Sequence, residues 1–561
     1  MSPVKCMVIL TSIAATFFIL CLLFSSIATK VEIHRADNVQ FTKRVYTSRG
    51  IVRGFLVDYG ANRKELFFGS AYIFLGIPFA QPPVDELRFQ LPQPVEKFRK
   101  EEGELTYKPR CAQANETGKK GQSSSEDCLY LNVFTPNVTG KYPVMVWIHG
   151  GAHFKGGAND FHYKGAVRNF VSNGVVVVTI QYRLGPFGFF TTFTPDFPAN
   201  LGLFDQILAL RWVKEEIGAF GGDPEQITLF GQSAGAMSIS GLSLSPLTKG
   251  LFNRMILDSG SVLVSFFVPN DTRGSIQRLR AAQWCEIKAD PMTSAKARNQ
   301  LRNCLSNLTT EEIIKHDRSL SNAGALRWAP VRDGVVFPED PEVLALSRPP
   351  YDVLLLDMPV EQTMFAPSYK SGNVSTFGPR SLKKALLNRH YGYLSDKQLN
   401  TMVDILMENY KTTDFEKDDH LGWFKLIMDI ISAERYTNYG RLEADWLKSQ
   451  GSRVYLATFT YDKRVCGSHS AIPGYDPTTH SNDICYLWFT PSEWEKASRE
   501  GKVTARDLAV ADNFGRVYTQ FAKNGTTGWP ESGSDYKFMN FDDSLDQMSN
   551  NWRAKDNYVF T

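Results

Sequence analysis

Short apolar runs alternate with segments of helical periodicity through most of this chain, and this alternation constrains its fold most. Residues 175–180 are all β-branched, which is typical of a strand buried on both faces of a parallel sheet. Apolar residues then recur at helical spacing over 203–217, and Gly221 and Gly222 end that pattern. The alternation predicts an α/β fold with a large, mostly parallel central sheet flanked by helices.

One expected strand end carries a recognisable turn. Residues 231–235 read Gly-Gln-Ser-Ala-Gly, follow an expected strand over 226–230 and lead into a helical segment. This is the G-x-S-x-G turn, which presents a nucleophilic serine between a strand and a helix. Sheets of this kind carry their sites at the carboxyl ends of their strands. The sequence therefore predicts Ser233 as a nucleophile, and the alternative interpretation is a structural turn.

A serine nucleophile needs a base that takes its proton and an acid that orients the base. In folds that carry this turn, the acid and then a histidine follow the serine along the chain. Asp357 and Glu361 are the nearest acids after an expected strand over 353–356. Spacing alone does not choose among the histidines that follow, which are His390, His420, His469 and His480.

A developing oxyanion needs backbone N–H donors. A glycine-rich turn follows the expected strand over 144–148 and offers the N–H groups of Gly150, Gly151 and Ala152. Ala234, the residue after the serine, offers another. These groups are candidates for an oxyanion hole.

The amino terminus indicates the compartment. Residues 6–29 carry no charge and lie between Lys5 and Lys30. Small residues at 26–28 suit cleavage of a signal peptide, and the run is also long enough to cross a bilayer of about 30 Å. We expect residues 1–29 to be a cleaved signal peptide or an uncleaved signal-anchor helix. Residues 30–561 would then form one domain in the secretory pathway, either secreted or anchored with its catalytic part in the lumen.

Sequons and cysteines agree with this route. N-x-Ser/Thr sequons predict N-glycosylation at Asn115, Asn137, Asn270, Asn307, Asn373 and Asn524. Cysteines after the leader fall into three close couples, and disulfides are expected in an oxidising lumen. These cysteines are Cys111, Cys128, Cys285, Cys304, Cys466 and Cys485.

Composition and charge narrow the function classes. Apolar residues make up 43% and charged residues 22% of the chain, which is the profile of a globular protein. The 62 basic and 59 acidic side chains leave a net charge of +3, and no long Lys/Arg run is present. We therefore expect no nucleic-acid partner.

At this point the chain resembles the type B carboxylesterase/cholinesterase family of the α/β-hydrolase superfamily. Residues 220–235 resemble one family signature, and residues 126–134 resemble the other. The resemblance spans about residues 45–555 and implies an α/β-hydrolase fold without a metal or organic cofactor. It also implies roles for particular residues, with Glu361 as the acid, His480 as the base, and Gly151, Ala152 and Ala234 as the oxyanion-hole donors.

The resemblance also implies two disulfides, Cys111–Cys128 and Cys285–Cys304. Cys466 and Cys485 match no family disulfide and bracket His480 in sequence. We hypothesise that they bond and stiffen the loop that carries the base, because a closed loop restrains the chain.

Three positions depart from the family pattern. Ala152 replaces a glycine of the expected oxyanion hole, so a Cβ restricts φ there and we expect altered acyl preference. Gln232 stands where many relatives have a glutamate, so His480 should be protonated less readily than in those relatives. Gln362 follows the expected acid in place of a glycine.

The resemblance implies a general carboxylesterase that cleaves small-molecule carboxylic esters through an acyl-enzyme on Ser233. Cholinesterases hold an ammonium group with a tryptophan between the first two bridged cysteines, and residues 112–127 contain none. Choline esters are therefore not the expected substrates. Leu326 and Trp328 predict an apolar acyl pocket. The rival hypotheses are a catalytically weak adhesion protein of the cell surface and an acyltransferase with the same acyl-enzyme, and the sequence predicts no oligomeric state.

Overall fold

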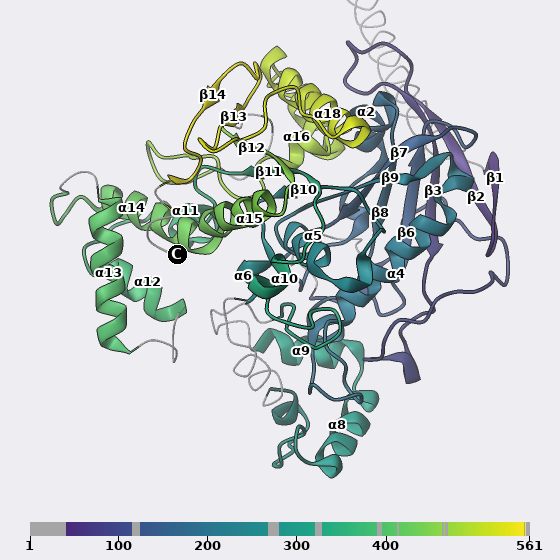
Figure 1. Ribbon diagram of the computed structural model, residues 1–561, viewed down its shortest axis with the longest axis horizontal. Coiled ribbons are helices and arrows are strands. Elements are labelled where there is room, and N and C mark those ends of the chain that lie inside the picture. Colours follow the sequence, from purple (N-terminus) through teal and green to yellow (C-terminus); the bar gives the residue numbers. More distant parts are fainter. Residues whose placement is uncertain are drawn as a thin grey trace, which may run out of the picture.

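A twelve-stranded sheet runs through the part of the chain that the structure describes (Figure 1). This computed structural model describes residues 41–114, 124–266, 280–319, 328–389, 395–411, 415–462, 465, 469–554 and 556. The strands lie in the order β1 (Lys43–Thr47), β2 (Gly50–Asp58), β3 (Ser70–Pro78), β6 (Tyr130–Thr135), β8 (Val176–Ile180), β7 (Tyr142–Ile148), β9 (Gly222–Gln232), β10 (Arg254–Asp258), β11 (Asp352–Asp357), β12 (Arg453–Phe459), β13 (Phe538–Phe541) and β14 (Met548–Ser549). A separate pair joins β4 (Arg110–Cys111) to β5 (Ser124–Ser125).

The centre of the sheet is parallel, as the sequence predicts. Neighbouring strands from β8 to β13 pair in parallel, and antiparallel strands flank them at both edges. All five residues of β8 are buried, which explains their uniform β-branched character. Strand β9 starts at Gly222, earlier than the sequence pattern indicates, because Gly221 takes φ 82° and ends the preceding helical turn.

Helices pack on both faces of this sheet (Figure 1). The longer ones are α2 (Tyr163–Asn169), α4 (Leu201–Glu216), α5 (Ala234–Leu244), α8 (Ala295–Asn307), α9 (Thr310–Ser319), α12 (Ser381–Arg389), α13 (Asp396–Tyr410), α14 (His420–Ser432), α15 (Asn438–Ser449), α17 (Pro491–Arg499) and α18 (Ala505–Asn524). Short ones are α3 (Gly185–Phe189), α6 (Val262–Phe266), α10 (Pro341–Ala345), α11 (Pro367–Ser371) and α16 (Ile484–Leu487). Helix α4 is the one expected over 203–217.

Strand β7 shows how the two cores form. Val144, Val146 and Ile148 pack in the core that α4 and α5 cover. Met145 and Trp147 point the other way, into the core beneath α2 and α18. Side chains alternate between the faces of a strand, so a strand with no polar position in its interior requires helices on both sides.

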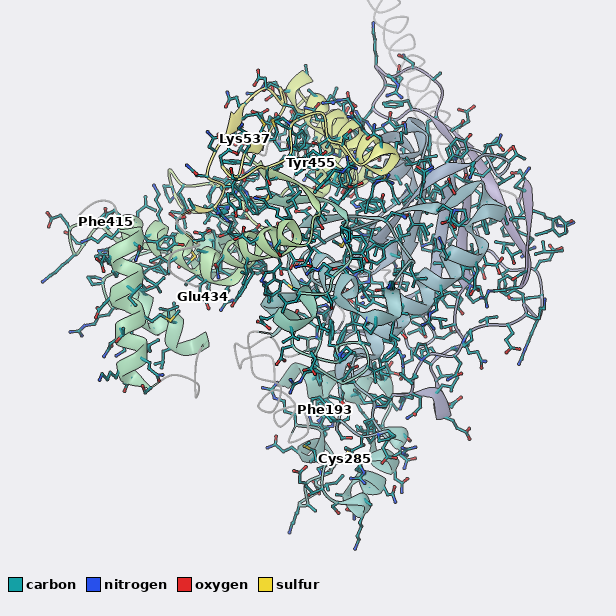
Figure 2. All side chains as sticks on the ribbon, in the orientation of Figure 1. Phe193, Cys285, Phe415, Glu434, Tyr455 and Lys537 are labelled. Carbon is teal, nitrogen blue, oxygen red and sulfur yellow. A yellow bond between two sulfur atoms is a disulfide. The ribbon has the colours of Figure 1, made fainter. Side chains whose placement is uncertain are left out.

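Two of the predicted disulfides are present. Cys111–Cys128 and Cys285–Cys304 are bonded, and Figure 2 shows Cys285 in the lobe that α8 and α9 form. Cys485 is also disulfide-bonded. Cys466 lies outside the described residues, so its pairing with Cys485 stays a prediction.

Four of the predicted glycosylation sites fall in the described part of the chain. Asn137, Asn307, Asn373 and Asn524 are all exposed, as a glycan requires. Asn115, Asn270 and the leader 1–29 lie outside the described residues. Among the described helices, none is long and apolar enough to cross a membrane.

A buried ion pair joins α4 to the segment after β8. Arg183 binds Asp205 through Nε and Nη2 at 2.8 and 2.7 Å, and both side chains are buried. Arg453 and Asp352 form the same two-bond geometry at 2.7 Å, with the arginine 43% exposed.

These two pairs should differ in what they contribute to stability. Asp205→Ala leaves a buried guanidinium unpaired, so we expect it to lower the free energy of unfolding by about 3–5 kcal/mol. Arg453→Ala should lower it by about 1 kcal/mol or less, because Arg453 is exposed and Asp352 keeps its contact with Arg254 at 3.4 Å. Urea unfolding of both variants measures the difference, and equal losses would contradict this account.

Candidate active site

Ser233 occupies a strained turn between β9 and α5. Its φ of 56° and ψ of −125° are rare for a residue with a side chain. A Cβ at Gly235 would lie 1.9 Å from the carbonyl oxygen of Ile148, and a Cβ at Gly231 would lie 2.7 Å from the same atom. Glycine is therefore required on both sides of the serine, because the end of β7 passes directly against the turn.

Glu361 and His480 form a buried pair next to Gln232, the residue before Ser233. His480 Nδ1 is 2.6 Å from Glu361 Oε2, and both side chains are buried. The backbone N–H of Met358 donates to Glu361 Oε1 at 2.8 Å. These contacts hold the carboxylate in one orientation and place an imidazole proton on Nδ1, which donates to Glu361.

The other acids and bases that the sequence allowed have different partners. Asp357 binds Arg553 at 2.7 Å. His420 Nδ1 contacts a backbone carbonyl and His469 Nδ1 contacts a carboxylate, both at 2.7 Å. His390 lies outside the described residues. In the part of the chain that the structure describes, no group of three or more His, Cys, Asp and Glu side chains is arranged to bind a metal ion.

The residue before the serine connects the base to the turn. Gln232 Nε2 lies 3.1 Å from His480 Nε2 and donates to Ser481 Oγ at 2.8 Å. Since an amide nitrogen only donates, His480 Nε2 accepts this hydrogen bond. Ser233 is 8% exposed, and among the described contacts its hydroxyl makes no hydrogen bond to His480; in serine hydrolases such a bond commonly tightens only when substrate binds.

The glycine-rich turn after β7 packs against the same place. A Cβ at Gly150 would lie 2.6 Å from the carbonyl oxygen of Gln232. Among the described residues, the N–H groups of Gly151 and Ala152 donate to no backbone carbonyl or side chain. Ala234 begins α5, where the N–H has no intrahelical acceptor. All three expected oxyanion donors are thus unengaged, and Ala152 reaches this position at φ 53° despite its Cβ.

Comparison with known proteins identifies the family. Residues 42–559 match the model of the Carboxylesterase family. The chain belongs to this family. It is 31% identical over 528 residues to a medium-chain fatty acyl-CoA hydrolase precursor of Anas platyrhynchos, which covers 89% of this chain and 88% of the relative. It is also 32% identical to carboxylesterase 1C and 39% identical to carboxylesterase 1D of Rattus norvegicus, with 87% of each chain covered.

Family membership confirms the resemblance seen in the sequence and the α/β-hydrolase fold. The chain is a carboxylic ester hydrolase.

The buried histidine of the glycine-rich turn adds no charge to this carboxylesterase site. His149 stacks on Tyr182 with 4.4 Å between ring centroids. Burial lowers the pKa of His149 to about 4, so the ring is neutral at neutral pH. Stabilisation of an oxyanion at this turn would therefore come from N–H dipoles.

Two aromatic rings lie beside the ring of His480, and no sequence motif marks either of them. The ring of Tyr436 lies 4.8 Å from the ring of His480, and that of Phe365 lies 5.5 Å from it. Tyr436 belongs to a π-helical turn over Ala433–Thr437, a distortion that is frequent at functional sites. Phe365 is 50% exposed. Its position four residues after Glu361 is a sequence signal for Phe365, and Tyr436 has none.

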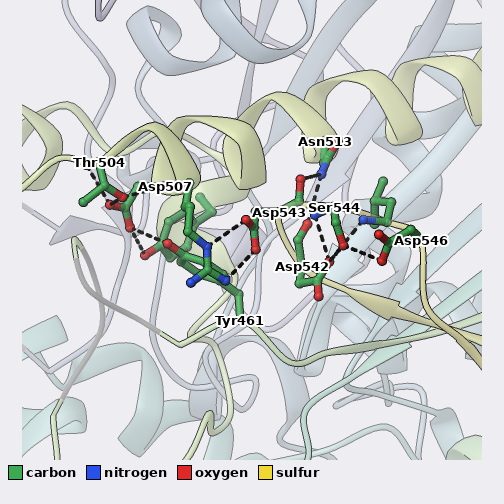
Figure 3. Close-up of polar contacts among 11 residues, drawn as sticks. Tyr461, Thr504, Asp507, Asn513, Asp542, Asp543, Ser544 and Asp546 are labelled. Carbon is green, nitrogen blue, oxygen red and sulfur yellow. Dashed lines mark hydrogen bonds and ion pairs between the residues drawn. The ribbon is translucent and has the colours of Figure 1, made fainter.

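The loop of the base is tied to the start of α18 (Figure 3). Tyr461 precedes this loop, Tyr486 follows it, and both hydroxyls donate to Asp507 Oδ1, at 3.1 and 3.3 Å. The other oxygen of Asp507 accepts the N–H of Thr504 at 2.9 Å and thereby caps the helix. The two ends of the His480 loop are therefore held by one buried carboxylate.

Gln232 should set the pH range of the carboxylesterase. In Gln232→Glu, a carboxylate beside Nε2 favours the imidazolium, which cannot accept the serine proton. The acidic limb of kcat/KM should therefore move to higher pH, and the ratio of activity at about pH 6 to that at about pH 8 should fall about threefold or more.

Gln232→Met is the matched control, because it removes both hydrogen bonds without adding charge. We expect it to lower kcat and leave the acidic limb in place. Acidic limbs at the same pH in both variants would count against this role of Gln232.

Proposed function

We propose that this carboxylesterase cleaves its substrates through an acyl-enzyme on Ser233, with His480 as the base and Glu361 as the acid. The observation that carries the proposal is the buried hydrogen bond between Glu361 and Nδ1 of His480. It leaves Nε2 to accept a proton, and Nε2 lies 3.1 Å from the amide of Gln232, the residue before the serine, so the serine hydroxyl would replace that amide at Nε2. A catalytic triad of this type needs that tautomer.

The chemical steps follow from these positions. His480 Nε2 takes the proton of Ser233 Oγ as the oxygen attacks the ester carbonyl. Glu361 stabilises the imidazolium, and the N–H groups of Gly151, Ala152 and Ala234 donate to the oxyanion. The imidazolium protonates the departing alcohol. A water molecule, deprotonated by His480, then releases the acid.

We infer an apolar carboxylic ester as the substrate class. Residues 112–127 offer no tryptophan for an ammonium group. Trp328 is fully buried and its indole N–H donates to Asp317 at 2.8 Å. Its contribution to an acyl pocket stays a proposal, and Leu326 lies outside the described residues. The name of the Anas platyrhynchos relative makes medium-chain acyl groups the first series to test.

We also propose that the mature chain is made in the secretory pathway and glycosylated. Its disulfides suit an oxidising compartment, and the described sequon asparagines are accessible. Amino-terminal sequencing of the mature protein distinguishes a cleaved signal peptide from a retained anchor.

Covalent labelling tests the nucleophile. A fluorophosphonate probe should modify the wild type and fail to modify Ser233→Ala, because phosphonylation requires an activated serine oxygen. Ser243→Ala, on the same helix and likewise buried, is the matched control and should still be labelled. Labelling of Ser233→Ala at the wild-type rate would refute the assignment.

The same experiment addresses the rival functions. A protein that only mediates adhesion would not be labelled. An acyltransferase would be labelled, but in the presence of an added alcohol it would release more transfer ester than free acid. For the hydrolase we expect mainly free acid, which chromatography of the products measures.

A further inference from the structure

Two buried carboxyl groups lie beside the proposed triad and have no part in its chemistry. Asp258 ends β10, the neighbour of β9 in the sheet (Figure 1). Asp483 follows His480 by three residues and precedes α16. Their exposed fractions are 1% and 0%. Charged side chains are rarely buried this completely without a partner.

Neither carboxyl group meets a cation. Asp258 Oδ2 and both side-chain oxygens of Asp483 meet no N–H or O–H donor from any other described residue. Instead, the two carboxyl groups lie within hydrogen-bonding reach of each other. An ionised carboxylate only accepts hydrogen bonds, so a hydrogen bond between these two groups requires a proton on one of them.

The surrounding groups favour that proton. Burial raises the pKa of Asp258 well above its ordinary value, and the nearby carboxyl groups of Asp483 and Glu361 add to the rise. Burial raises the pKa of Asp483 as well, and His480 opposes that rise. Tyr518 faces both from α18, and burial raises its own pKa, so it supplies no charge. Two negative charges at this place would repel each other and Glu361.

The pair connects the two halves of the site. The backbone carbonyl of Asp258 accepts the N–H of Ser233 at 2.8 Å, so this residue supports the nucleophile turn directly. The backbone carbonyl of Asp483 accepts the N–H groups of Tyr486 and Leu487 at 2.9 Å, which fixes it to α16. A bond between the two side chains therefore fastens the loop of the base to the strand end beside the nucleophile.

We propose that Asp258 and Asp483 share one proton and act as positioning residues, and that the protonated pair holds the His480 loop against the Ser233 turn. The part of this inference that concerns activity rests on the proposed function. When the pair loses its proton at high pH, two buried carboxylates face each other and the loop separates from β10. The kcat/KM should therefore fall on the alkaline side.

Stability should follow the same titration. Above the ordinary pKa of aspartate the unfolded chain has lost this proton while the folded chain keeps it. The unfolding equilibrium constant should thus rise with pH, by about tenfold per pH unit from this pair, until the folded pair also titrates.

Asparagine variants test the pair. In Asp258→Asn or Asp483→Asn, an amide donates permanently to the remaining carboxylate. The ratio of kcat/KM at about pH 9.5 to that at about pH 8 should rise about threefold or more over wild type. The unfolding equilibrium constant of these variants should no longer show the tenfold rise per pH unit that the shared proton contributes in wild type. The infrared carbonyl band of a protonated carboxyl group, present in wild type at neutral pH, should disappear.

Asp223→Asn is the matched control. Asp223 is also buried, but it lies at the opposite end of β9 and has its own donors. This variant should keep the infrared band and the wild-type alkaline limb.

The results separate the two proposals. Absence of the band in wild type, or its persistence in both pair variants, would overturn proton sharing. An unchanged alkaline limb in both would overturn the positioning role. If the probe fails to label Ser233, the proposed function falls, and the infrared and unfolding measurements still decide on the shared proton.

Discussion

The close approach of two backbone segments governs this site. The carbonyl oxygen of Ile148 passes so near Gly231 and Gly235 that neither could carry a side chain. That approach lets β7 and β9 end at the same level and forces Ser233 into its left-handed φ. Strain of this kind persists only where the surrounding structure holds it. Here the hydrogen bond from Ser233 N–H to Asp258 and the first turn of α5 hold it.

Around this turn the protein places acidic groups with little positive charge to balance them. Arg553 neutralises Asp357 and also donates to the carbonyl of Met358 at 2.6 Å, so a residue near the end of the chain fixes the segment before Glu361. Glu361 itself faces the imidazole of His480. Asp258 accepts the hydroxyl of Ser259 at 3.2 Å, but neither Asp258 nor Asp483 meets an arginine or lysine of the described chain, which is why we assign them a shared proton. Each carboxyl group thus has a separate means of tolerating burial.

Local sequence patterns predicted much of the fold. The β-branched run at 175–180 corresponds to β8, and the helical spacing over 203–217 corresponds to α4. In both cases the burial of the side chains depends on the local element alone, so the order of residue types along the chain reveals it. The sequence pattern predicted the start of β9 too late. Gly221 ends the preceding helical turn with a left-handed backbone conformation, and the spacing of apolar residues does not reveal where such a turn ends. Tyr436 was missed because a π-helical turn displaces it from the ordinary helical register. The hydrogen bond from Gln232 to His480 and the proposed pairing of Asp258 with Asp483 each join a strand end to the loop before α16, so neither has a local sequence pattern.

By itself, the sequence determined the nucleophile turn. A strand, two obligatory glycines and a helix start lie within a few residues, so local sterics decide its shape. It also determined, through family signatures, that the chain is a carboxylesterase. Only the tertiary structure decided which acid and which histidine meet, because Glu361 and His480 are 119 residues apart and Asp357 and His469 were equally available in sequence. The register of β11 beside β10 and the closure of the loop after β12 by Asp507 bring this pair to Gln232, the residue before Ser233. Contacts between such distant residues are set by the packing of the whole sheet.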